Sequence, residues 1–448
     1  MSDNLRMGGR ADNLGLSKPA PLPIVRRSRI VPTRLLLVAV FILSSASILA
    51  EDWLQWRGPA NDGRSPATKL PASWKADSAN VTKVDMPGPG ASTPCIVGDR
   101  MVMTAQVKAD VVLFCISRDG KPLWQRMLGR GEDKYRGDEG NLASASCSSD
   151  GKLAFAFSGT GMLGAYAIED GKPAWEIDCK QVYGAFKIQF GGHWTPVLHK
   201  GILYVTLMHR ERQTIFAFDA ATGKELWKAE RKSDGKGESP DVYCSPFLWQ
   251  KGDKALLIVH GNDYCTAHDL KDGSEVWRVS ELNPKANYNR AWRAVSSPLV
   301  TPDLIVIPSC KQHPTVAVKP EGLRGNIPAS GEAWRFPKTP DVPSPLLVDD
   351  VVYLMGAGGQ LNALDAATGK LLYDESLTNE RHRSNPMFAD GKLYLLGREG
   401  TCPVLKAGRT FEELAKNKLP DTFTASPVAV DGKLYLRGWK HLWIVSGN

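Results

Sequence analysis

The sequence predicts an all-β protein, an eight-bladed β-propeller of four-stranded antiparallel blades whose ring is closed by the N-terminal strand. Three observations predict it. An aromatic residue, mostly tryptophan, recurs about every fifty residues, and a proline, usually after serine or threonine, recurs about twenty residues after it. The last repeat lacks one strand that a spare N-terminal segment can supply. A repeat of this length is typical of propellers and solenoids.

The repeated aromatic position marks the end of each unit. Its members are separated by 50, 51, 52, 50, 57 and 39 residues: Trp74, Trp124, Trp175, Trp227, Trp277, Trp334 and Tyr373. The sequence before them is also repeated: residues 219–227 are DAATGKELW and residues 365–373 are DAATGKLLY. We interpret these aromatic residues as structural and expect them to pack between neighbouring blades.

Each unit divides into four short strands. In the third unit we expect strands over 196–199, 201–208, 215–219 and 225–229, because β-branched and aromatic residues alternate there between turn residues. Asp-Gly pairs such as Asp390-Gly391 and Asp431-Gly432 join the first two strands of later units. This dipeptide favours tight hairpins.

The two ends of the chain complement each other. The eighth unit has strands expected over 433–437 and 442–446, and no fourth strand follows. Residues 74–76, Trp-Lys-Ala, copy residues 227–229 and precede Pro94 by twenty residues, so they are predicted to be the missing outer strand. A missing last strand matched by a spare first one fits a closed ring better than a capped solenoid.

Two units are irregular. The fifth carries an insertion over 319–330, and the seventh replaces its Thr-Gly-Lys turn with a sequence beginning at Thr410. The spacing of Thr410 and Glu413 is that of a capping box and predicts a short helix.

The first fifty residues resemble an export signal. Basic residues up to Arg34 precede nine apolar residues, 35–43, and then small residues. The uncharged stretch 35–50 has sixteen residues, fewer than the ~20 that a spanning helix needs. We therefore expect an N-terminal extension and signal peptide over 1–50, a single domain over 51–448, no stable membrane span, and a periplasmic or cell-envelope location.

The charge argues against nucleic acid as a partner. The net charge is +8, but residues 1–34 contribute +5 of it, with seven basic and two acidic residues. The remaining +3 is too little for the concentrated basic face of a nucleic-acid-binding domain.

Eight cysteines occur singly, without a CxxC motif. They are compatible with disulfides in an oxidising compartment, and equally with small buried residues in strands. No zinc or other metal site is indicated, and the histidines lack a metal-binding spacing.

Candidate binding residues lie just before the innermost strand of several blades. In a propeller these loops ring the mouth of the central channel. They are His193, Trp194, Tyr243, Trp292, Arg293 and Arg383. Such side chains can stack on and pair with a small anionic ring compound, a sugar or a peptide carboxylate. Alternatively, they only pack the rim.

The repeat Ala-x-Asp-x-x-Thr-Gly-x-x-x-Trp, present at 217–227 and with a final tyrosine at 363–373, resembles the PQQ-like eight-bladed propeller family over about residues 52–448. The opening residues 52–59, DWLQWRGP, also resemble the start of many exported members. The resemblance implies the fold. The family includes quinoprotein dehydrogenases as well as non-catalytic members such as the propeller lipoprotein of outer-membrane barrel assembly, so fold does not settle function.

The dehydrogenase members resemble one another in a vicinal cysteine pair beside PQQ, an acidic calcium site and a catalytic aspartate. This chain has no adjacent cysteines, and no calcium motif matches. We therefore expect no catalytic residue and no cofactor, and a non-catalytic binding or scaffolding module with an envelope protein or a small anionic or sugar ligand as partner. The alternative is a PQQ- and calcium-dependent quinoprotein oxidoreductase acting on alcohols or sugars.

Overall fold

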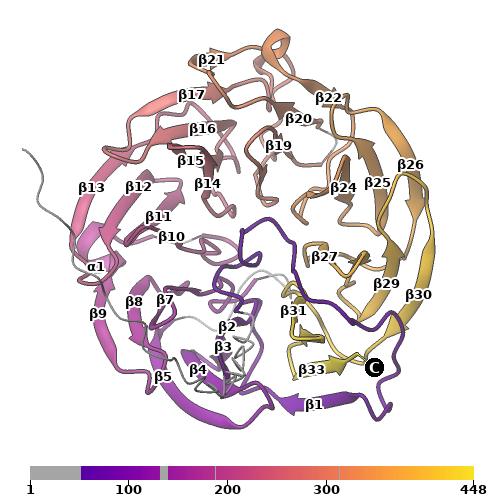
Figure 1. Ribbon diagram of the computed structural model, residues 1–448. Helices are drawn as coiled ribbons and strands as arrows, with labels where there is room; N and C mark the ends of the chain where they lie inside the picture. The colour runs from indigo at the N-terminus through magenta and orange to yellow at the C-terminus, as the bar shows by residue number, and fades with distance from the viewer. Residues whose placement is uncertain (1–51, 132–139, 187, 312, 448) are drawn as a thin grey trace, which may run out of the picture. The chain divides into compact units, whose positions relative to one another are not determined.

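The computed structural model describes residues 52–131, 140–186, 188–311 and 313–447. All of them belong to one compact unit, Leu49–Asn448. They form eight antiparallel sheets arranged as blades around a central axis (Figure 1). The predicted eight-bladed propeller is therefore confirmed. The predicted signal peptide lies outside the described residues.

Within each blade the strands follow one another outwards from the axis. Blade 1 holds β2 (Cys95–Val97), β3 (Arg100–Val107), β4 (Asp110–Ser117) and β5 (Pro122–Arg130). Blade 2 holds β6 (Ser148–Ser149), β7 (Leu153–Phe157), β8 (Met162–Ala167) and β9 (Pro173–Asp178). Blade 3 holds β10 (Val197–His199), β11 (Ile202–His209), β12 (Arg212–Asp219) and β13 (Glu225–Glu230). Blade 4 holds β14 (Phe247–Lys251), β15 (Lys254–Gly261), β16 (Tyr264–Asp269) and β17 (Glu275–Val279).

The other four blades repeat this order with small departures. Blade 5 holds β18 (Leu299–Val300), β19 (Ile305–Ile307), β20 (Thr315–Val318) and β22 (Trp334–Phe336). Blade 6 holds β23 (Leu346–Val348), β24 (Val351–Met355), β25 (Gln360–Asp365) and β26 (Leu371–Ser376). Blade 7 holds β27 (Met387–Ala389), β28 (Lys392–Tyr394), β29 (Thr401–Lys406) and β30 (Glu413–Lys418). Blade 8 holds β31 (Val428–Val430), β32 (Lys433–Arg437), β33 (His441–Ser446) and β1 (Val81–Asp85).

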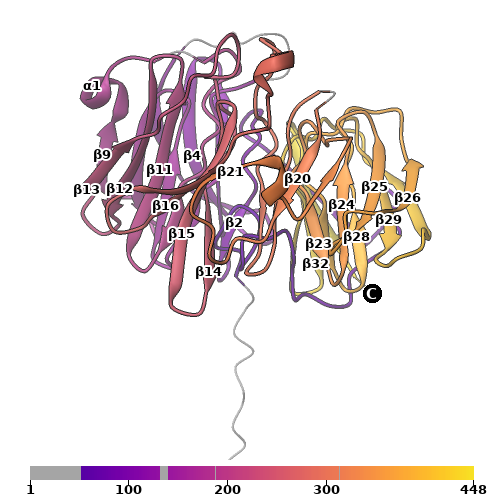
Figure 2. The same ribbon diagram turned by 90° about the horizontal axis from the view of Figure 1, so that it is seen from above.

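In the side view the strands run nearly upright (Figure 2). The turns that join them therefore lie at the two opposite ends of the blades. The first hairpin turn of blades 7 and 8 is the predicted Asp-Gly pair. Asp390, Gly391, Asp431 and Gly432 all have positive φ, between 46° and 72°, as a two-residue hairpin of the primed type requires. Three short helices, α1 (Cys179–Tyr183), η1 (Lys285–Asn287) and η2 (Ala329–Gly331), lie in connecting segments.

A closed belt of hydrogen bonds joins the eight blades near the axis. In each blade a backbone N–H just before the inner strand donates to the side-chain oxygen of the equivalent residue in the next blade, at 2.6 to 3.3 Å. The chain of donors and acceptors runs through Thr93, Ser146, Thr195, Ser245, Ser297, Ser344, Asn385 and Ser426, and returns to Thr93. These are the residues before the repeated prolines, with Ser146 in the unit that lacks one.

The repeated tryptophans fasten the outer parts of the blades. The indole N–H of Trp227 donates to the Leu270 carbonyl of the next blade at 3.0 Å, and the ring lies against Gly273. A Cβ atom at Gly273 would come within 2.6 Å of this indole. Trp124, Trp175 and Trp334 make the same pair of contacts with the blades that follow them. The tryptophan of one blade and the glycine in the turn between the last two strands of the next blade thus form one contact between blades.

Where the glycine turn is missing, another residue covers the aromatic ring. In blade 5 the insertion adds β21 (Gly325–Ile327), which pairs in parallel with β17 beside Trp277. In blade 7 the ring of Phe411 lies 5.9 Å from that of Tyr373. The predicted helix at Thr410 is wrong, because the residues from Glu413 onwards continue the blade as β30.

The ring closes through the N-terminal segment, as predicted, but not through Trp74. The outer strand of blade 8 is β1, and Val81 to Asp85 pair antiparallel with β33. Trp74 lies seven residues earlier and outside any strand. The copied tripeptide 74–76 therefore predicted correctly that the N-terminal segment closes the ring, but the strand that does so begins seven residues after Trp74.

Trp74 instead packs against blade 7. The tryptophan position of β30 is occupied by Ala415, which pairs with Val404 as Trp227 pairs with Ala217 in blade 3. The indole of Trp74 stacks on Tyr394 with ring centroids 6.5 Å apart, and its backbone N–H donates to Asn417 Oδ1 at 2.8 Å. The N-terminal segment thus supplies an indole that blade 7 lacks.

Between its start and β1, the N-terminal segment 52–74 crosses the central opening of the ring (Figure 1). Trp53 pairs with Ile96 of blade 1, and Leu54 O accepts from Ser149 N of blade 2. Farther on, Arg64 pairs with Phe388 of blade 7, and Ser65 Oγ donates to Ala429 O of blade 8 at 2.7 Å. We call residues 52–74 the plug.

All eight cysteines lie within the described residues, and all are buried free thiols. Their predicted burial is confirmed, but only Cys95, Cys115, Cys265 and Cys402 lie in strands, as the prediction also required. Among the described residues, no helix has the length and apolar character needed to span a bilayer.

The belt predicts a stability cost for a single hydroxyl. Ser245→Ala removes the acceptor of Thr195 N–H, and a buried donor left without a partner costs about 1 to 3 kcal/mol. We expect urea denaturation to show a loss of that size. Ser274→Ala, at an exposed serine in a turn, is the control, and an equal loss in both variants would argue against the belt.

Ring closure predicts the effect of truncation. Deletion of residues 1–85 removes the plug and β1 and leaves the β33 edge unpaired, whereas deletion of 1–50 keeps both. We expect the longer deletion to aggregate or to melt at least about 10 °C lower. Thermal unfolding and limited proteolysis measure this. A soluble 86–448 protein that melts like the 51–448 protein would contradict closure by β1.

Candidate binding cavity

A cavity of about 600 Å³ lies at the axis, at the end where the connections between blades emerge. Every one of the eight segments that lead into an inner strand contributes to its wall. Their contributions include Ala91, Ser144, His193, Tyr243, Arg293, Ser344, Arg383 and Ser426. The cavity is therefore a product of ring closure.

The plug also contributes to the cavity. Trp56 lines it, and the indole lies 6.0 Å from the Phe247 ring of β14. The backbone around it is fixed because Trp53 Nε1 contacts Trp56 O at 3.4 Å, and Arg57 is buried with Nη2 donating to Pro345 O at 2.7 Å. The Trp56 indole is thus held in a fixed position beside the inner strands.

Aromatic rings also form one side of the wall. Phe190 and His193 each lie edge-on to Tyr243, with centroids 5.7 and 5.4 Å away. Burial lowers the pKa of His193 below its ordinary value, although its ring nitrogen bonds to the Phe190 carbonyl at 2.9 Å. Burial likewise raises the pKa of Tyr243. Both rings are therefore uncharged at neutral pH.

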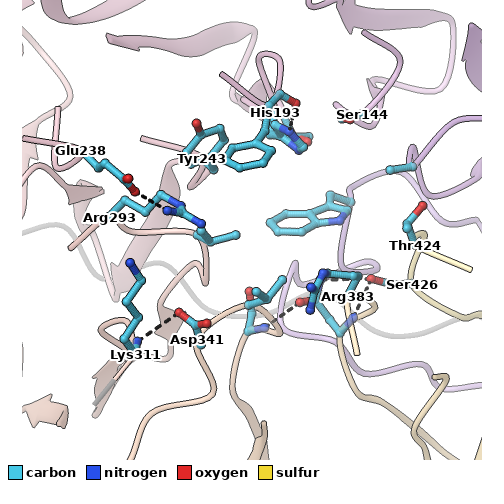
Figure 3. Close-up of a pocket in the computed structure, with 18 residues that line it drawn as sticks. Ser144, His193, Glu238, Tyr243, Arg293, Lys311, Asp341, Arg383, Thr424 and Ser426 are labelled. Carbon is cyan, nitrogen blue, oxygen red and sulfur yellow. Dashed lines mark hydrogen bonds and ion pairs between the residues drawn. The ribbon is translucent and has the colours of Figure 1, made fainter. Parts of the chain in front are cut away.

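Three permanent cations line the rest of the cavity. Arg293 and Lys311 lie on one side and Arg383 lies across from them (Figure 3). Arg293 forms an ion pair with Glu238 and lies over the Phe190 ring at 5.1 Å. With Glu238 and Asp341 as the acids of the lining, the cavity carries a net charge of +1.

Lys311 and Asp341 form a strained pair. Both have positive φ, 54° and 67°, a region that residues other than glycine rarely adopt. The Lys311 backbone N–H donates to Asp341 Oδ1 at 3.1 Å, and Lys311 Nζ donates to Ala291 O at 2.7 Å. The ammonium group is therefore held in place by contacts at both ends of the residue.

A buried carboxylate braces the loops that carry Glu238 and Arg293. Asp263 is 1% exposed, has φ 68°, and accepts four hydrogen bonds from the two loops. Its donors are Ser239 Oγ at 2.7 Å, Asn283 Nδ2 at 2.9 Å, Tyr288 Oη at 2.7 Å and Lys285 Nζ at 3.3 Å. Asp263 thus fixes the two loops that hold the ion pair of Glu238 and Arg293 in the cavity wall.

The structure brings together four of the six predicted binding residues. His193, Tyr243, Arg293 and Arg383 line the cavity. Trp194 and Trp292 do not: both are fully buried, and the Trp194 indole donates to Val242 O of the next segment at 2.9 Å. Each precedes or follows a lining residue, so its side chain leaves the backbone on the other side and enters the space between blades.

Sequence reasoning missed Trp56, Glu238, Lys311 and Asp341. Trp56 lies in the DWLQWRGP opening that carried the family resemblance, so its motif was visible but its position was not. Lys311 lies in the β19–β20 loop, on the face that the strand order assigns to binding. Glu238 and Asp341 precede inner strands like the residues that were predicted, and only the emphasis on aromatic and basic residues excluded them.

A quinone cofactor with calcium fits this cavity only in part. Its rings and cations suit a flat organic anion. However, Glu238 is paired with Arg293, and Asp341 accepts from Lys311. No three His, Cys, Asp or Glu side chains of the described residues gather as a metal site. Calcium needs several oxygen ligands with carboxylates among them, and both carboxylates of this lining are already engaged.

The chain belongs to the PQQ-like β-propeller family. The family model that matches is described as outer membrane protein assembly factor BamB, and it matches residues 159–322 and 325–446, more than half of the chain. This agrees with the blade order and with the repeat that the sequence shows.

The chain is similar in fold to many solved structures, including a quinohemoprotein alcohol dehydrogenase and BamB. The quinohemoprotein alcohol dehydrogenase from Comamonas testosteroni has a TM-score of 0.65 at 14% identity, covering 89% of this chain and 81% of that one. BamB from Moraxella catarrhalis has a TM-score of 0.56 at 14% identity, covering 81% and 95%. These likenesses show the fold alone.

A curated relative is the lanthanide-dependent methanol dehydrogenase of Methylorubrum extorquens, 28% identical over 95 residues. The match spans 19% of this chain and about 15% of the length of that protein.

The position of Trp292 predicts a structural role. Trp292→Ala removes a fully buried indole that lies edge-on to His260 at 6.3 Å. We expect a loss of about 3 to 5 kcal/mol in the free energy of unfolding, measured by urea denaturation. Leu226→Ala, at an exposed residue of β13, should change it little. A Trp292→Ala protein of unchanged stability would contradict this placement.

Proposed function

We propose that this protein is a non-catalytic binding module of the cell envelope whose central cavity binds a small organic anion with a planar ring. The observation that carries the proposal is the convergence of an aromatic plug residue, an aromatic wall and three cations on one cavity of about 600 Å³. Pockets of about 300 to 1,000 Å³ are typical of ligand sites, and this one combines aromatic rings with a larger set of polar and charged groups.

The charge arrangement supports an anion in particular. Arg293 and Arg383 carry planar guanidinium forks suited to a carboxylate, and Lys311 adds a point charge. The rings of Trp56 and Tyr243 offer faces or edges for a ligand ring. A neutral sugar would use the rings and acids but not the excess positive charge.

Two further parts of the proposal, the location in the cell envelope and the binding of a protein partner, are supported by other observations. The signal-like residues 1–50 support export. Similarity in fold to BamB, named as an outer membrane protein assembly factor, supports a scaffold that binds envelope proteins. Affinity purification from an envelope fraction, with and without a saturating aromatic acid, tests whether a partner binds at the cavity face.

Anion binding predicts opposite effects of two substitutions. Calorimetric titration with benzene-1,3,5-tricarboxylate measures affinity. Arg293→Gln should weaken binding about tenfold or more because it removes a charged donor. Glu238→Gln should strengthen it about threefold to tenfold because it frees Arg293 from a partly exposed ion pair.

The controls use a similar ion pair away from the cavity. Arg278 and Glu275 pair on β17, and Arg278→Gln and Glu275→Gln should leave affinity unchanged. Weaker binding by Glu238→Gln, or equal effects of Arg293→Gln and Arg278→Gln, would contradict the proposal. Tighter binding of neutral glucose than of the tricarboxylate would assign the cavity to sugars instead.

A second candidate is a quinoprotein oxidoreductase. The 95-residue similarity to a lanthanide-dependent methanol dehydrogenase favours it. Incubation with PQQ and calcium or lanthanum, followed by gel filtration and dye reduction with methanol, separates the two candidates. Retained cofactor absorbance together with alcohol-dependent dye reduction would establish the enzyme and overturn the non-catalytic module.

A further inference from the structure

A second, smaller cavity adjoins the central one. It measures about 330 Å³ and lies between blades 5 and 6, and Lys311 lines both cavities. Its other walls come from the segment after β22 and from β24, β25 and the turn between them. We call it the side pocket.

The side pocket has a cationic rim and an apolar wall. Lys338 lines it together with the amides Gln360 and Asn362, and Pro337 and Leu354 contribute apolar surface. Asp374 positions two of these residues: it forms an ion pair with Lys338 at 2.5 Å and accepts a hydrogen bond from Gln360 Nε2. The Lys338 ammonium group holds the pKa of Asp374 below its ordinary value, so the pair is charged at neutral pH.

The two lysines retain capacity to bind an anion. Within the described residues, each ammonium group donates to one acceptor: Lys311 to Ala291 O and Lys338 to Asp374 Oδ2. An ammonium group has three N–H donors, so each can also donate to a ligand.

The backbone at the junction fixes the position of Lys311. Lys311 and Asp341 hold each other in the left-handed region. Such strain costs about 1 to 3 kcal/mol per residue and persists where the surroundings enforce it, often at ligand sites. Here it places one ammonium group on the wall shared by both cavities.

We propose that the side pocket is a second carboxylate subsite, and that the ligand is an elongated dianion with a ring in the central cavity and a flexible carboxylate tail between Lys311 and Lys338. The apolar surface of Pro337 and Leu354 takes the methylene groups of the tail. This inference rests on the proposed function, because the ring must bind in the central cavity.

The test uses benzoate and benzoates with a second carboxylate on a para-alkyl chain of two, four or six methylene groups. Calorimetric titration of the full chain measures each affinity. We expect one tail length to bind about tenfold more tightly than benzoate. Lys338→Met should abolish that gain and leave benzoate unchanged, and Lys338→Arg should retain most of it.

The control is Lys416→Met, because Lys416 forms a comparably exposed pair with Glu413 on β30. It should keep the full gain. A gain that survives Lys338→Met, or no gain at any tail length, would overturn the side pocket while benzoate binding sustains the central cavity. If neither benzoate nor any diacid binds, the proposed function fails and the subsite fails with it.

Discussion

The belt of hydrogen bonds around the axis is the constraint on which the other features depend. Each inner segment donates one N–H to its neighbour and accepts one on a side-chain oxygen, so the eight blades share a single closed circuit. Buried backbone N–H groups must find partners, and a blade that left the circuit would leave one unsatisfied on each side. Because the same segments form the cavity wall, the requirement that closes the ring also fixes the distances between the cations and rings.

The outer contacts follow a different rule. Tryptophan of one blade needs glycine in the next, since a Cβ at Gly273 would overlap the indole of Trp227. Where this pair is lost, the chain compensates with Phe411 on Tyr373, with β21 beside Trp277, and with Trp74 on Tyr394. Substitution of one contact by another of similar volume keeps the interior filled.

The plug connects ring closure with the central cavity. The same N-terminal segment supplies Trp56 to the cavity, Trp74 to blade 7 and β1 to blade 8. A ring that closes by recruiting its own N-terminus therefore completes the wall of this cavity in the same step. The strained pair Lys311 and Asp341 and the buried Asp263 support this surface from outside the belt.

Local repetition determined the fold, because tryptophan spacing, Asp-Gly turns and alternating strands each report on contacts within a blade or with the next one. Through the strand order it also indicated the face on which the cavity lies, and four of the six predicted residues line this cavity. It did not distinguish Arg293, which faces the axis, from Trp292, which faces the space between blades. Neighbouring side chains in a loop point in directions set by local backbone angles, and the repeat length carries no information about those angles. The path of residues 52–74 across the ring was decided by tertiary structure alone. Apart from Trp74 at its end, that segment follows no repeat, and only the assembled inner strands offer it partners for its backbone and a place for Trp53 and Trp56.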